Sequence, residues 1–97
     1  MYIIEVPQQL FELGEVVATP GALDALAAAS VMHTAIIRRH IEGDWGDLCA
    51  EDKEANQAAL ETGARILSAY TLPTKQRIWI ITEADRSVTT LLLPNEY

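Results

Sequence analysis

The sequence predicts an α+β domain with a short N-terminal strand, three helices, and then a three-stranded antiparallel β-meander packed on the helices. Apolar residues recur at helical spacing up to Gly63 and afterwards alternate with a period of two residues. The connections between the alternating segments are short and polar, as hairpins require. The chain of 97 residues matches the usual size of one domain. We therefore expect a single domain, 1–97, with residues 1–10 as an extended N-terminal arm.

A short strand at 14–18 is expected to lead into the first helix at 20–29. The Thr19 side chain can accept a hydrogen bond from the first helical turn. Pro20 costs no hydrogen bond, because the N–H group at that position has no partner within a helix. The apolar residues that we expect this helix to bury are Leu23, Leu26 and Ala27.

Two further helices are expected before the strands. The second begins at Ser30 or His33 and ends at Ile41, and Gly43 is suited to stop it. The third occupies 50–62 and has acidic residues in its first turn, where the helix dipole favours negative charge. The residues expected to pack inward are Ile36, Ile37 and Ile41 in the second helix, and Ala55, Ala58, Ala59 and Leu60 in the third.

Three β-rich segments follow the helices, at 64–71, 77–83 and 88–93. A sheet of three strands alone is only marginally stable and needs another layer packed on one face. We expect the preceding helices to form this layer. Tyr70 and Trp79 are expected to form a cross-strand aromatic pair. If both rings face solvent, they would instead form a binding patch.

The formal net charge of −7 is concentrated in one part of the chain. Residues 42–54 contain six acidic side chains and one basic side chain, Lys53. Such a surface repels the phosphate backbone of nucleic acids and attracts a basic partner or a cation. We therefore expect a protein partner with a basic surface and no direct binding of nucleic acid. The acidic residues are Glu42, Asp44, Asp47, Glu51, Asp52 and Glu54.

The sequence carries no sign of export or membrane insertion. No segment approaches the roughly 20 apolar residues that span a bilayer, and residues 1–5 lack the basic start of a signal peptide. Cys49 is the single cysteine, so an internal disulfide is excluded, and we expect a buried structural thiol. These features predict a cytoplasmic protein without a membrane partner.

Residues 40–47 hold the densest group of potentially functional side chains. His40 with Asp44 and Asp47 suggests a metal site, or a general base oriented by a carboxylate. In the structural interpretation, His40 binds a carbonyl at the helix end, the aspartates cap backbone N–H groups of the next helix, and Trp45 fills the core. One histidine without a second histidine or thiolate at ligand spacing is weak evidence for a transition metal. We favour the structural interpretation.

The connection at 82–87 offers a second candidate. It can present Glu83, Asp85 and Arg86 as a polar recognition tip. In the simpler interpretation it is a solvated hairpin turn, in which Asp85 binds its own backbone and Ser87 starts the next strand. We favour the simpler interpretation here as well.

Several blocks of the sequence resemble a known family. The most distinctive block, Gly43-Asp-Trp-Gly-Asp-Leu48, follows Arg39-His40. The others are Ala18–Leu23, Glu51-Asp52 with Asn56, Arg65–Tyr70, Trp79–Glu83, Asp85–Ser87, and Leu93-Pro94 with Glu96-Tyr97. Together they resemble a family of small, functionally uncharacterised, plasmid-related proteins of bacterial plasmids, integrative elements and phages. The similarity begins at about residue 11 and implies a mobile-element setting. It supplies no catalytic or ligand assignment.

The leading hypothesis is a small acidic, non-enzymatic protein-interaction domain of a mobile element. Inhibition of a host defence or nucleic-acid-handling protein is its most specific version. This hypothesis expects no catalytic residue, no cofactor and no metal. The residues expected to bind the partner are Glu42, Asp44, Trp45, Asp47, Glu51, Glu54, Asp85 and Arg86.

Two other hypotheses remain open from the sequence. The first is a small-molecule or nucleotide-binding domain, perhaps enzymatic, with a site around His40, Asp44, Trp45 and Glu83. Arg86 would add a polar contact, and aromatic rings would stack on the ligand. The second is a structural homodimer that pairs through Leu91–Leu93 on an edge strand.

Overall fold

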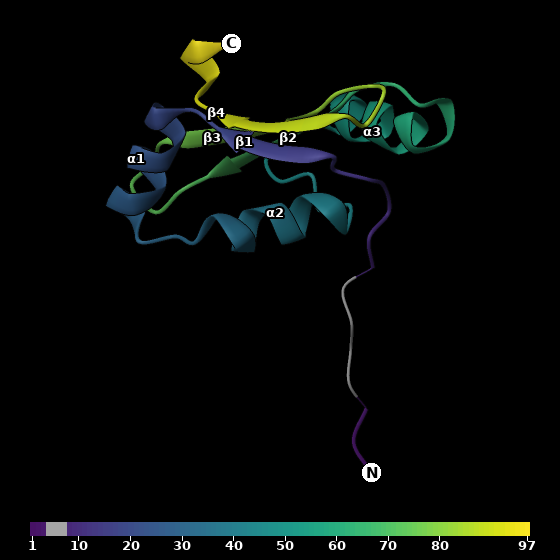
Figure 1. Cartoon of the computed structure of the whole chain (residues 1–97), viewed down its shortest axis with the longest axis horizontal. Coiled ribbons are helices and arrows are strands. Elements are labelled where there is room, and N and C mark those ends of the chain that lie inside the picture. The colour runs from purple at the N-terminus through teal and green to yellow at the C-terminus, as the bar shows by residue number, and fades with distance from the viewer. Residues whose placement is uncertain (4–7) are drawn as a thin grey trace.

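The computed structural model describes residues 1–3 and 8–97. Figure 1 shows a single sheet with helices on one side and at one end. Residues 4–7, which belong to the predicted N-terminal arm, lie outside the described part. The elements are β1 (Glu15–Ala18), α1 (Pro20–Ala29), α2 (His33–Ile41), α3 (Ala50–Thr62), β2 (Ile66–Thr71), β3 (Arg77–Thr82), β4 (Val88–Leu92) and the 3-10 helix η1 (Pro94–Glu96).

The α+β class is confirmed, but the sheet has four strands in the order β1-β4-β3-β2. β2, β3 and β4 form the predicted antiparallel meander. β1 joins it as a fourth strand, parallel to β4. The three helices and two strands that separate β1 from β4 return the chain in the same direction, which a parallel pair requires. The predicted edge position of Leu91–Leu93 is therefore wrong, because β4 lies inside the sheet.

α1 and α2 cover one face of the sheet, and η1 lies on the other side (Figure 1). The core on the helical side includes Tyr70, Ile80 and Leu91. α1 packs on it mainly through alanines, which allow its backbone to approach closely. Its buried residues are Ala22, Ala25 and Leu26. Leu23 and Ala27 are exposed, so two of the three core positions predicted for this helix are wrong.

Tyr70 and Trp79 do not form the predicted cross-strand pair. In the β2–β3 register Tyr70 lies opposite Ile78, and Trp79 lies opposite Ala69. Because successive side chains point to opposite faces of a sheet, the two rings lie on different faces. Tyr70 is buried beneath the helices. Trp79 contacts Tyr97 with ring centroids 5.7 Å apart.

The outer edge of β2 is closed by the α2–α3 connection and by α3. Ala69 donates its N–H to the Trp45 carbonyl (3.1 Å) and accepts from the N–H of Asp47 (2.7 Å). The Asn56 side chain donates to the Leu67 carbonyl (2.6 Å) and accepts from its N–H (3.2 Å). α3 thus approaches the sheet through a polar residue. Of the four residues predicted to pack inward from α3, Ala59 is buried, Leu60 is half-buried, and Ala55 and Ala58 are exposed.

Asn56→Ala is expected to lower the free energy of unfolding by about 2 kcal/mol, because both polar backbone groups of Leu67 lose their partner. Gln57→Ala, on the exposed side of the same helix, is the matched control and should change stability by less than about 0.5 kcal/mol. Urea unfolding followed by circular dichroism measures both values. Equal effects of the two substitutions would contradict this account of the β2 edge.

Candidate functional site

Two of the carboxylates predicted to bind a partner are paired with arginines of α2. Arg38 Nε lies 3.1 Å from Glu42 Oε1, and Arg39 Nε lies 2.7 Å from Asp44 Oδ2. The hydrogen bond from Arg39 is the main cause of the lowered pKa of Asp44. Asp44 also accepts from the N–H of Gly46. These two acidic charges are balanced within the protein itself.

Asp47 is tied to the sheet and does not cap α3 as predicted. Its Oδ2 accepts from the N–H of Thr71 at 2.9 Å, and hydrogen bonds from the side chain and the backbone of Thr71 lower the pKa of Asp47. Its carbonyl accepts from Arg77. The residue that precedes α3 is Cys49, whose side chain makes no capping bond. Cys49 is exposed, so the prediction of a buried thiol is wrong.

The remaining acidic surface lies on α3. Glu51 and Glu54 are exposed, and neither takes part in an ion pair within the described part of the chain. Asp52 lies beside them in the first turn. The predicted acidic surface is therefore reduced to α3 and Asp47, at the β2 edge of the sheet.

The β3–β4 turn has the solvated-turn geometry favoured from the sequence. Asp85 accepts from the N–H and the hydroxyl of Ser87, and these bonds lower its pKa. Arg86, at φ 59°, points back to the body of the protein. Its guanidinium donates to three carbonyls, those of Ala59, Ala64 and Glu83. Arg86 thus joins the end of α3 to the turn. Of the predicted recognition tip, Asp85 is exposed, and Glu83 and Arg86 are half-buried.

Trp45 and His40 are both buried, with 5% and 0% of their surface exposed. The Phe11 ring lies between them and the β3–β4 turn. Its centroid is 5.1 Å from that of His40 and 6.2 Å from that of Trp45, and Arg86 lies over it at 5.8 Å. The structure therefore brings the helix connection and the turn together, but packed side chains fill the space between them.

His40 is the centre of a buried chain of hydrogen bonds. Thr89 donates to the Leu13 carbonyl, so its oxygen accepts from Thr82 (2.8 Å). The Thr82 oxygen then accepts from Nε2 of His40 (2.9 Å). Nδ1 is left as the acceptor for the Ser68 hydroxyl (2.6 Å). This order places the proton of a neutral His40 on Nε2 and links α2 to three strands.

The surroundings of His40 favour a structural role. Burial disfavours the charged ring and lowers the pKa of His40 to about 3. The ring bonds side chains of the sheet rather than a carbonyl at the end of α2, so that part of the structural prediction is wrong. In residues 1–3 and 8–97, no group of three His, Cys, Asp or Glu side chains could hold a metal ion.

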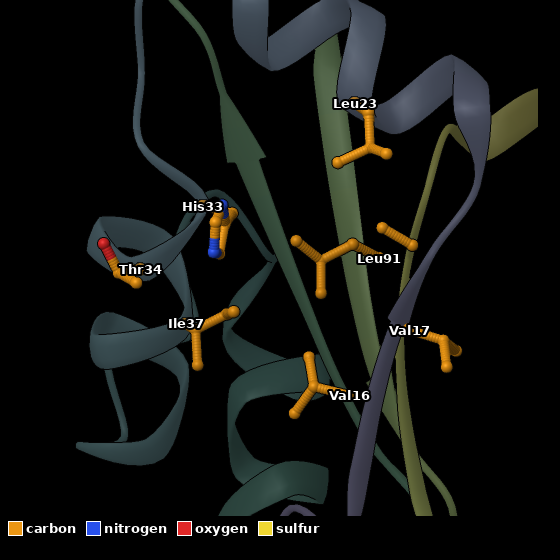
Figure 2. A pocket seen from close by; sticks show the side chains of 8 residues that line it. Val16, Val17, Leu23, His33, Thr34, Ile37 and Leu91 are labelled. Atoms are coloured by element: carbon orange, nitrogen blue, oxygen red, sulfur yellow. The ribbon is translucent and has the colours of Figure 1, made fainter.

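An apolar groove of about 350 Å³ lies beside β1, on the helical side of the sheet. Figure 2 shows Val16, Leu23, Ile37 and Leu91 directed toward the same space, while Val17 points to the other side of its strand. The strands, α1 and the first half of α2 form its walls. The residues that line this β1 groove are Val16, Val17, Ala18, Leu23, His33, Thr34, Ile37 and Leu91.

The backbone beside the groove forms an open sheet edge. The N–H groups of Glu15 and Thr19 donate to carbonyls on the β4 side, at Ser87 and Leu91. Because successive backbone groups of a strand point to opposite sides, those of Val16 and Ala18 point away from β4. β1 has no neighbour on that side within the described sheet. The protein thus combines unpaired strand groups with an apolar groove, the combination used to bind extended peptides.

Two features of the chain kept this groove from being predictable from the sequence. Leu23 was assigned to the core, but 50% of its surface is exposed at the groove. The segment 14–18 was predicted as a short strand without an assigned place in the sheet, so its position at an edge was not foreseen. The available signal was the adjacent pair Val16-Val17, which places one apolar side chain on each face of the strand.

No protein-family model, curated protein or solved structure matches this chain. The resemblance to plasmid-related proteins therefore stays a prediction. In the described residues no single helix is long and apolar enough to cross a membrane. α1 and α2, bent by 106° at the break between them, are together long and apolar enough to pass a test for a membrane span. Core helices of water-soluble proteins pass the same test.

Proposed function

We propose that this chain is a non-enzymatic protein-interaction domain that binds an extended segment of its partner at the β1 groove. The single observation that carries the proposal is the open β1 edge beside an apolar groove. A strand added there would pair with the backbone of Val16 and Ala18. Alternate side chains of that strand would enter the groove between β1 and α2.

The acidic surface of α3 favours a partner that also carries basic residues. Glu51 and Glu54 lie at the β2 edge, opposite the edge that carries the groove. They would therefore make a second, separate contact with the partner, weakened by salt. In the mobile-element setting implied by the sequence resemblance, the partner would be a host defence or nucleic-acid-handling protein. The small-molecule alternative has less support, since His40 and Trp45 are buried and bound by neighbouring side chains.

Peptide selection tests the proposal without knowledge of the natural partner. A random peptide library displayed on phage is selected against the full chain, and the recovered peptides are expected to show alternating apolar residues. Ile37→Asp places a charge in the groove and should weaken their binding at least about tenfold. Ile41→Asp, on the same helix but outside the groove lining, is the matched control. Recovery of no peptide, or equal binding by both variants, would refute groove binding.

A further inference from the structure

Residues Met1–Ile3 form an apolar segment that no other described residue covers. Met1, Tyr2 and Ile3 have relative exposures of 120%, 95% and 95%. Figure 1 shows this end of the chain well away from the sheet. This exposed run of large apolar side chains is available for contact with another molecule.

This segment is anchored at its base. Leu10 donates its N–H to the Ile41 carbonyl (2.9 Å), and Phe11 is buried. Seven residue steps separate Ile3 from Leu10. At about 3.3 Å per step they span at most roughly 23 Å. The apolar end can therefore lie well outside its own domain and reach a neighbouring molecule.

The exposed end and the β1 groove are chemically matched. None of the described residues that line the groove is Lys, Arg, Asp or Glu. The side chains of Met1, Tyr2 and Ile3 are uncharged, so the segment carries a charge only at the terminal amino group of Met1. Aromatic and β-branched residues such as Tyr2 and Ile3 are favoured in strands. The open edge beside the groove offers their backbone the hydrogen bonds that a strand needs.

We propose that residues Met1–Ile3 of one copy bind in the β1 groove of a second copy, and that reciprocal exchange gives a closed dimer. Each copy has one exposed end and one groove, so a two-fold exchange covers both apolar surfaces and leaves neither open. The proposal rests on the same groove as the proposed function, and it makes the second copy a competitor of the partner peptide. Because each copy carries a net charge of −7, added salt should strengthen this dimer.

A complementation experiment tests the exchange. One variant lacks residues 1–3 and keeps the groove. The other, Val16→Pro, keeps the apolar end and loses an outward N–H group, in an edge position where proline is tolerated. The full chain is expected to be a dimer by light scattering after gel filtration, and each variant alone a monomer. A mixture of the two variants should form a heterodimer held by one end in one groove.

The outcomes separate this proposal from its alternatives. A monomeric full chain, a dimer that survives removal of residues 1–3, or variants that do not combine would each overturn it. Circular dichroism and the urea midpoint of each variant show whether it is folded, and Tyr2→Asp with Ile3→Asp repeats the test at full length. A monomer that still binds selected peptides at the groove would overturn the exchange and leave the proposed function intact.

Discussion

Gly46→Ala is expected to lower the free energy of unfolding by about 3 kcal/mol or more. Gly46 has φ +78°, and a Cβ atom there would lie 2.0 Å from the Ala69 carbonyl oxygen and 2.7 Å from Cδ1 of Tyr70. The first contact is with backbone, so a rotamer change cannot relieve it. To make room, the connection would have to leave β2 and give up its hydrogen bonds to Ala69, made by the Trp45 carbonyl and the Asp47 N–H.

Gly63→Ala is the matched control. Gly63 has the same φ of +78°, but no heavy atom lies within 4 Å of its added Cβ. Its substitution should therefore show only the cost of a left-handed conformation, about 1 kcal/mol. Urea unfolding of both variants separates the close approach at Gly46 from the backbone conformation. Equal losses of stability in the two variants would mean that the close approach of residue 46 to β2 does not contribute to the destabilisation.

The distinctive Gly43-Asp-Trp-Gly-Asp-Leu48 block has a structural explanation in this fold. Gly43 adopts φ +86° after α2, and Trp45 enters the core. Gly46 permits the close approach to β2. Asp44 and Asp47 bind nearby backbone N–H groups. The interpretation of this block as structural is supported, although the sequence could not show that its partner is the edge of β2.

Local signals predicted the helices well. The Thr19 side chain accepts from the N–H of Ala22, as its position before Pro20 indicated. α1 and α3 have the predicted bounds, 20–29 and 50–62. The Thr19-Pro20 start of α1 and the glycine after α3, Gly63, act within one or two turns of the chain. These determinants need no knowledge of the rest of the fold.

Properties that depend on distant contacts were not predictable. β1 pairs with a strand more than 70 residues later, and this pairing decides which edge of the sheet is open. His40 similarly meets Ser68 and Thr82, residues 28 and 42 positions away. Composition and periodicity describe each segment separately, so they could not distinguish a buried histidine from one in a site.

Acidification is expected to destabilise the protein through His40. Its pKa is about 3 in the folded state, against 6.5 for an ordinary histidine. Between these values the unfolded chain binds a proton that the folded chain does not, so stability falls as the pH falls. Between about pH 7 and pH 4 the loss from this residue alone should be about 3 kcal/mol. The lowered pKa values of Asp44, Asp47 and Asp85 act mainly below this range.

His40→Gln removes the titrating group while it keeps a polar side chain in the hydrogen-bond chain. The variant is expected to be less stable at neutral pH. The slope of its free energy of unfolding against pH should be smaller by the amount that corresponds to nearly one bound proton. His33→Gln, at the exposed start of the same helix, is the matched histidine control. Urea unfolding at a series of pH values measures the three slopes. A His40→Gln variant with the original slope would mean that the buried ring takes up a proton in the folded state, which would contradict a neutral structural histidine.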